Sequence, residues 1–123
     1  MAVEPDVIRR GSVVLVRVRG DKARPAVVVR SDLLAELPYA TVLPITSELR
    51  ADASMRLDIE ASPETGLRVA SQVMVDWPQT IRLTEMGQVI GRVDMKAMRA
   101  VTRQLAILLG IGGSGKPRRD RPA

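Results

Sequence analysis

Pro25-Ala-Val-Val-Val29 is the stretch that decides the fold, because it is an unbroken apolar run of strand length. β-branched residues favour strands, and a run without polar alternation predicts a strand that is buried on both faces. We expect Pro25 at the first position of this strand, where a missing N–H is tolerated. A strand of this kind needs neighbouring strands and apolar cover on both sides.

Further strand patterns lie on either side of this run. A strand is predicted over 12–18 (SVVLVRV), and others over 40–45, 55–59, 69–75 and 80–83. A short helix is predicted over 31–37, capped by Ser31 or Asp32 and ending before Pro38. These five or six short strands predict a mainly β fold.

The last predicted element is an amphipathic helix that begins after Asp94, a favourable N-cap, and ends at Gly110. Val93 and Met98 are spaced for a hydrophobic staple across the cap. Apolar positions then recur at three- and four-residue steps: Met95, Met98, Val101, Thr102, Leu105, Leu108 and Leu109. We expect this stripe to pack on a small, mainly antiparallel barrel and to close one side of it.

The chain divides into three parts. Residues 1–8 are predicted to be a flexible N-terminal arm, residues 9–111 one domain, and residues 112–123 (GGSGKPRRDRPA) a disordered basic tail. The net charge is +5, of which the tail holds four basic residues against one acidic residue. The folded part is therefore only mildly positive, which suits a polyanionic partner.

The sequence has no run long and apolar enough for a membrane span and no signal-peptide pattern, so we expect a cytoplasmic protein.

Composition excludes several kinds of chemistry. The chain has no Cys and no His, so thiol chemistry, zinc sites with Cys ligands and catalysis by a His base are all excluded. One Trp and one Tyr are the only aromatic residues, too few for a module that stacks several RNA bases on exposed rings. No metal site and no cofactor site is predicted.

Five stretches carry a recognisable pattern. They are 10–16 (RGSVVLV), 24–29 (RPAVVV), 42–47 (VLPITS), 75–81 (VDWPQTI) and 90–94 (IGRVD). In this order, and over residues 9–111, the chain resembles the MazF/PemK toxins. The resemblance implies a CcdB-like barrel of the SH3 type, a homodimer, and a metal-independent endoribonuclease that cuts single-stranded RNA. It also implies a cognate antitoxin with an acidic, partly disordered segment as a partner.

The resemblance points to Arg24 and Thr46 as catalytic residues, with Ser47 next to them as an RNA-binding residue. A guanidinium and a hydroxyl donor are suited to this role, because attack by the ribose 2′-OH places negative charge on the phosphate oxygens. DNA has no 2′-OH, so the mechanism itself would select RNA. We therefore expect Arg24 and Thr46 to lie side by side in a groove wide enough for one RNA strand.

The sequence also departs from the family pattern. Only residues 20–23 join the first two strands, where relatives usually carry a longer Gly-rich loop with a Glu or a His. Asp76 is retained and is the candidate that orients Arg24 or accepts a proton. Gln79 and Arg17 are further RNA-binding candidates. Trp77 has three interpretations: a platform for one RNA base, an anchor in a protein interface, or a core residue.

Two alternatives to the ribonuclease stay open at this stage. One is a non-catalytic, CcdB-like toxin that poisons DNA gyrase, which the short loop at 20–23 favours. The other is a barrel that only binds nucleic acid or protein. The residues of the pattern, Arg24 above all, favour the nuclease.

Overall fold

The computed structural model describes residues 8–17 and 22–112, so the predicted arm up to residue 7, part of the turn at 20–23, and residues 113–123 of the predicted tail lie outside the described residues. The fold is mainly β with one C-terminal helix, as predicted. In chain order the elements are β1 (Ser12–Val16), β2 (Arg24–Val28), the 3-10 turn η2 (Asp32–Leu34), β3 (Tyr39–Thr46), β4 (Arg56–Ile59), β5 (Ser71–Met74), β6 (Gln79–Arg82), the 3-10 turn η3 (Leu83–Glu85), β7 (Met86–Arg92) and α1 (Met95–Leu109).

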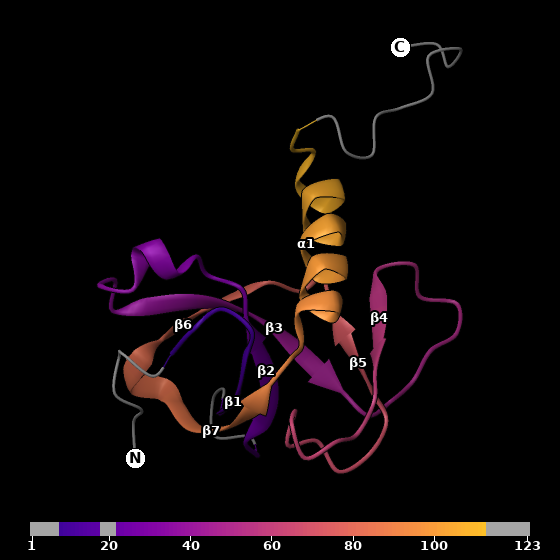
Figure 1. Cartoon of the computed structure of the whole chain (residues 1–123), viewed down its shortest axis with the longest axis horizontal. Helices are drawn as coiled ribbons and strands as arrows, with labels where there is room; N and C mark the ends of the chain where they lie inside the picture. Colours follow the sequence, from indigo (N-terminus) through magenta and orange to yellow (C-terminus); the bar gives the residue numbers. More distant parts are fainter. Residues whose placement is uncertain (1–7, 18–21, 113–123) are drawn as a thin grey trace.

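The strands form one antiparallel sheet in the order β4-β5-β3-β2-β1-β7, and β6 also pairs with β3. β3 is the longest strand and serves two partners along one edge, β6 through its first half and β5 through Ile45 and Thr46. The sheet bends around these strands, and α1 rises from one side of it (Figure 1). No helix in the described part of the chain is long and apolar enough to cross a membrane.

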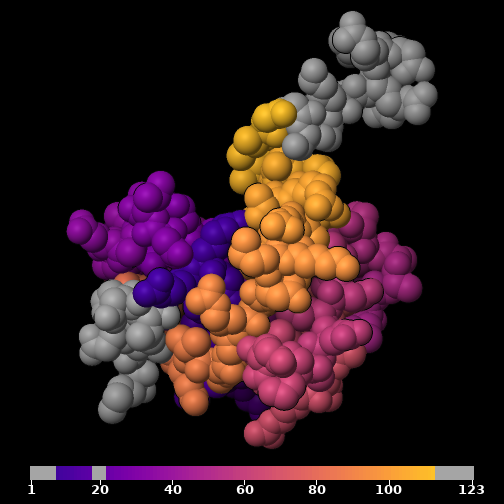
Figure 2. All heavy atoms as spheres, in the orientation of Figure 1, coloured from indigo at the N-terminus to yellow at the C-terminus, as the bar shows by residue number. Residues whose placement is uncertain are grey.

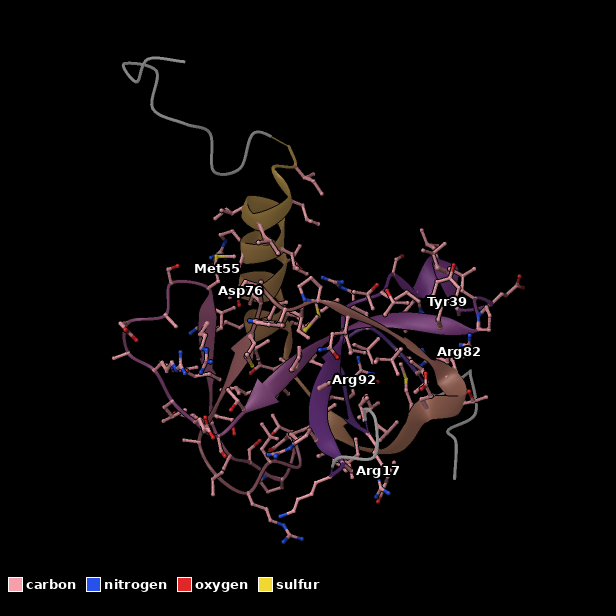
Figure 3. The ribbon with its side chains drawn as sticks, turned by 180° about the vertical axis from the view of Figure 1, so that it is seen from behind. Arg17, Tyr39, Met55, Asp76, Arg82 and Arg92 are labelled. Carbon is pink, nitrogen blue, oxygen red and sulfur yellow. The ribbon has the colours of Figure 1, made fainter. Side chains whose placement is uncertain are left out.

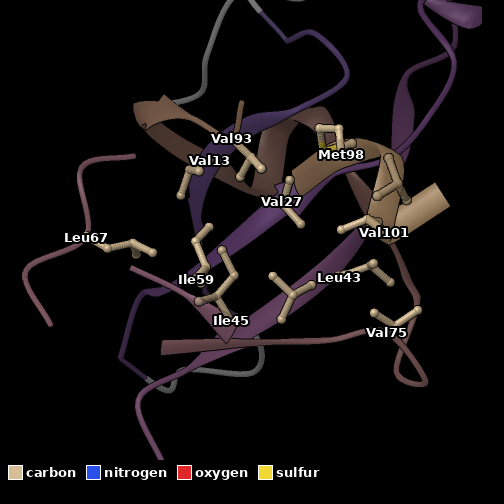
Figure 4. Close-up of a cluster of buried hydrophobic side chains, with 12 residues drawn as sticks. Val13, Val27, Leu43, Ile45, Ile59, Leu67, Val75, Val93, Met98 and Val101 are labelled. Atoms are coloured by element: carbon tan, nitrogen blue, oxygen red, sulfur yellow. The ribbon is translucent and has the colours of Figure 1, made fainter. Parts of the chain in front are cut away.

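β2 is buried on both faces, as its apolar run predicts. Val27 and Val28 are each 0% exposed, and they point into two different clusters. Val27 packs in the first cluster, beside Leu43 and under the helix residues Met98 and Val101 (Figure 4). Val28 packs in the second cluster with Val14, Val42 and Met86, among other residues. The central strands therefore hold together two cores on opposite sides of the sheet.

Most predicted strands differ from the observed ones by one or two residues at an end, as 69–75 does from Ser71–Met74, and three expectations for the first part of the chain are wrong. β2 begins at Arg24 rather than at Pro25, because Arg24 pairs with Val16 at the end of β1. Ile8, assigned to the N-terminal arm, is buried in the second cluster. The predicted helix over 31–37 is only the 3-10 turn η2, capped by the Ser31 hydroxyl, which accepts the Leu33 N–H.

α1 begins and ends where the sequence predicts. The Asp94 carboxylate accepts the N–H of Ala97 at 2.8 Å, and Gly110 ends the helix in the left-handed conformation with φ of 69°. The predicted stripe, however, packs only in its middle: Met98 and Val101 are buried and Leu105 packs against the first cluster, whereas Met95, Leu108 and Leu109 are exposed. The helix leaves the body of the protein at its C-terminal end (Figure 2). The expectation that the whole stripe covers the barrel is therefore wrong.

Candidate active site

Arg24 and Thr46 line the same groove, which has a volume of about 770 Å³. Ala26 pairs with Pro44 and Val27 with Leu43, and this register, continued by two residues, brings Arg24 opposite Thr46. Arg24 is exposed at the start of β2, and Thr46 is half-buried at the end of β3. Arg24 pairs with Val16 of β1, and Arg17 is the next residue along the chain. Figure 3 labels Arg17 at the end of the molecule that lies away from α1, so Arg24 is also at this end. Arg24 and Thr46 therefore share one groove, and the catalytic roles predicted for them stay a prediction.

The Thr46 side chain is oriented by a local hydrogen bond. Its Oγ1 accepts the backbone N–H of Glu48 at 3.1 Å. That bond uses a lone pair of the oxygen, so the hydroxyl hydrogen is available to donate to a bound group. Ser47 follows on the rim of the same groove and is exposed.

The groove has positive charge on apolar walls. Its basic residues are Arg24 and Arg68, and Glu48 is the one acidic residue among the described residues that line it. The apolar part of the lining is made by Leu15, Pro25, Pro44, Ile45, Leu67, Val69, Met74 and Ile90. A polyanion with flat apolar groups, such as a single strand of nucleic acid, matches this combination.

Sequence reasoning missed Arg68, which a loop between β4 and β5 carries to the groove. This loop lies directly against β7: a Cβ on Gly66 would be 2.2 Å from the carbonyl oxygen of Ile90, and one on Gly91 would be 2.3 Å from the carbonyl carbon of Thr65. Gly66 also has a φ of 75°, which favours glycine. The two glycines were the available signal, since close approach of two backbones requires them.

Sequence reasoning also missed Gln72, which holds the loop after Thr46. Gln72 lies opposite Thr46 on β5 and is buried. Its Oε1 accepts the Arg50 N–H at 2.9 Å and Arg56 Nη1 at 3.2 Å, and its Nε2 donates to the Arg50 carbonyl and to Asp58 Oδ1. A glutamine within the buried strand Ser71–Met74 was the signal, because buried polar groups need partners.

Two of the predicted RNA-binding residues line neighbouring hollows. Arg17 lines a hollow that shares Leu15 and Gln88 with the groove. Gln79 lines a smaller hollow that shares Arg24 and Pro44 with it. The groove is therefore continued on two sides by surfaces that carry predicted residues.

Asp76 and Trp77 are placed elsewhere. Both are exposed in the turn between β5 and β6, and neither lines the groove or the two hollows. Asp76 lies near Met55 on the side of α1 (Figure 3), where the Val75 N–H donates to the Met55 carbonyl. The structure thus does not bring Asp76 to Arg24, because the turn carries it away from the end of β2. Trp77 is 57% exposed, so its interpretation as a core residue is wrong.

Comparison with known proteins places this geometry in a family. A model of the PemK-like, MazF-like toxins of type II toxin-antitoxin systems matches residues 9–109. A probable endoribonuclease MazF of Mycolicibacterium smegmatis is 30% identical over 109 residues, which span 86% of this chain and 100% of its own.

Solved structures of toxins have the same fold. The Mycobacterium tuberculosis toxin MazF-mt6 matches with a TM-score of 0.69 and 26% identity, over 80% of this chain and 96% of its own. An endoribonuclease from a mycobacterial species, solved with its cognate antitoxin, matches with a TM-score of 0.71 and 21% identity, over 84% of this chain and 95% of its own. Neither the family model nor the relative from Mycolicibacterium smegmatis favours the gyrase alternative. The family match covers all ten described elements of the fold, and the chain belongs to the PemK-like, MazF-like toxins of type II toxin-antitoxin systems.

Proposed function

We propose that this toxin is an endoribonuclease that cuts single-stranded RNA through attack of a ribose 2′-OH on the adjacent phosphate. The observation that carries the proposal is that Arg24 and Thr46 line one groove, at neighbouring ends of the paired strands β2 and β3. The curated relative that shares 30% of its residues with this chain is itself named as a probable endoribonuclease.

Arg24 and Thr46 would act on the charge that develops at phosphorus. When the 2′-oxygen attacks, the non-bridging phosphate oxygens gain negative charge, and a guanidinium can bind two of them at once. The Thr46 hydroxyl, whose hydrogen is left available by its bond with Glu48, would donate to the same oxygens. Each such donor, when fixed in place, lowers the barrier by about 3–4 kcal/mol. We expect cutting to continue in EDTA, since these residues supply the stabilisation themselves.

The surfaces beside Arg24 would bind the rest of the strand. Ser47 lies on the rim, Arg17 lines one hollow and Gln79 the other, and we expect these residues to contact the nucleotides next to the cut. Trp77 is outside these surfaces. Its exposure therefore supports a role as an anchor for a protein partner rather than as a base platform in the groove.

We expect two protein partners. The first is a cognate antitoxin with an acidic segment, which the arginines of the groove would attract; a structural neighbour was solved with its own cognate antitoxin. The second is another copy of the chain. The end of α1 exposes Leu108, Leu109 and Ile111, an apolar surface that a homodimer would cover.

The proposal is tested with purified protein, a long single-stranded RNA and EDTA. We expect the wild-type protein to cut at specific sites and Arg24→Ala to leave the RNA intact. Arg103→Ala is the matched control, because it removes an exposed arginine of α1 that does not line the groove. Intact RNA with the wild-type protein, or equal cutting by Arg24→Ala, would contradict the proposed function.

A further inference from the structure

We propose that Glu48 is the general base of this toxin, the group that takes the proton from the attacking 2′-OH. The inference rests on the proposed ribonuclease function and adds to it the acceptor that the reaction needs. It is drawn from the position of Glu48 in the groove and from the contacts that fix its backbone.

The composition of the groove leaves one side chain suited to this role. Among its described lining residues, the ionisable ones are Arg24, Arg68 and Glu48. An arginine keeps its proton in proteins and cannot serve as an acceptor, and the hydroxyls of Thr46 and Ser47 are far weaker bases than a carboxylate. Asp76, the acceptor predicted from the sequence, does not line the groove. The carboxylate of Glu48 is therefore the acceptor that the geometry offers.

The backbone of Glu48 is held on both sides. Its N–H donates to Thr46 Oγ1 at 3.1 Å, and its carbonyl oxygen accepts Arg56 Nη1 at 2.7 Å. The same Arg56 nitrogen also donates to the buried Gln72, so the arginine is itself held in place. The side chain of Glu48 thus starts from a fixed backbone next to Thr46, and catalytic groups need fixed starting positions of this kind.

The proposed step balances in atoms and charge. The 2′-OH loses its proton to the Glu48 carboxylate as the O2′–P bond forms. The P–O5′ bond breaks, and the leaving 5′-oxygen takes a proton from water; the hydroxide that remains takes the proton from Glu48, which restores the carboxylate. The products are a 2′,3′-cyclic phosphate and a free 5′-OH, and Arg24 and Thr46 stabilise the charge on the phosphate between these two events.

The first experiment measures single-turnover cutting at saturating RNA. We expect Glu48→Gln, which has the same shape without the charge, to cut about 10²–10⁴-fold more slowly, the usual contribution of a general base. Glu48→Asp should recover part of that loss, because it restores a carboxylate. Glu60→Gln is the matched control: it neutralises an exposed glutamate outside the groove and should cut at the wild-type rate.

A second readout separates catalysis from folding and binding. The variant Glu48→Gln should bind an all-2′-deoxy strand, which cannot be cut, at least as tightly as the wild type, since it removes a negative charge from the groove.

Three results would overturn the assignment. One is cutting by Glu48→Gln within a few-fold of the wild type, and another is a loss of binding as large as the loss of rate. The third is slow cutting by Asp76→Asn together with cutting by Glu48→Gln at the wild-type rate, which would make Asp76 the general base. In each case the wild-type protein still cuts RNA, so these outcomes differ from a failure of the proposed function.

Discussion

β2 and β3 each change from core to active groove within a few residues. At their centres Val27 and Leu43 are 0% exposed and pack in the first cluster. At their outer ends Arg24 is exposed and Thr46 is half-buried, and both line the groove. The two regions share a backbone ladder, but their surroundings differ: the centre is covered by strands and α1, and the ends by loops.

The difference implies that stability and activity are separable in this protein. Substitutions at the strand centres should unfold it and leave the chemistry of folded molecules unchanged. Substitutions at the strand ends should stop the chemistry and leave the fold in place. The predictions below test this separation. A variant that lowers both the stability of the protein and the cutting rate of its folded form would show where the two regions are coupled.

Leu43→Ala should have the largest effect, on stability. Leu43 is fully buried on the central strand, and a substitution of this kind removes buried methyl groups and leaves a cavity. We expect the free energy of unfolding to fall by about 2–5 kcal/mol, measured by urea denaturation. Leu33→Ala is the control, because Leu33 is 94% exposed and its loss should change stability by less than about 0.5 kcal/mol. Equal effects of the two substitutions would contradict the burial of Leu43.

Thr46→Val should affect rate far more than stability. The substitution keeps the shape and the strand preference of the residue but removes the hydroxyl that we propose as a donor to the phosphate. We expect single-turnover cutting to slow by about 10²–10³-fold. The loss of the Glu48 N–H bond should lower stability by only about 0.5–1.5 kcal/mol. Thr46→Ser is the control, since it keeps the hydroxyl; an equally slow Thr46→Ser would contradict the role of that group.

The same comparison explains how much of the structure could be predicted. Strands such as Ser12–Val16 and Tyr39–Thr46 follow from short-range patterns, because their apolar residues need burial whatever surrounds them. β7, Met86–Arg92, was not predicted as a strand. It contains Gly87 and Gly91, and its pairing with β1 is interrupted by two register shifts. Its conformation is set by a distant partner, which a local pattern does not contain.

In the site, too, residues on strands could be predicted from the sequence more readily than residues on loops. Arg24 and Thr46 lie within recognisable strand motifs, and the register of β2 and β3 brings both to one groove. Arg68 and Glu48 reach the groove through loops whose paths depend on Gly66 and Gln72. Asp76 was misplaced because the sequence gives no direction for the turn after Val75. Sequence reasoning therefore missed or misassigned the side chains on loops, and it also missed Gln72, a strand residue that holds one of these loops.

Gln72→Leu should couple the two regions, because Gln72 is buried in the sheet and bound to the groove loop. The substitution leaves Arg50, Arg56 and Asp58 without this partner, and we expect stability to fall by about 1–3 kcal/mol. Since Arg56 also holds the Glu48 carbonyl, cutting by the folded protein should slow as well. Gln104→Leu is the control, because it makes the same substitution on α1, away from the groove, and should cut at the wild-type rate. A destabilised Gln72→Leu that cuts at the wild-type rate would show that the loop does not need this support.

Asp94→Ala should have the smallest effect, confined to stability. The Asp94 carboxylate caps α1 by accepting the Ala97 N–H, and the loss of such a cap costs about 1 kcal/mol. Asp94→Asn keeps a capping acceptor and should restore most of the stability in urea denaturation. Cutting should stay at the wild-type rate in both variants, because α1 packs on the first cluster through Met98 and Val101 and does not line the groove. Slower cutting by the folded Asp94→Ala protein would mean that the helix and the groove are coupled through the centres of β2 and β3, and that the separation between core and site is incomplete.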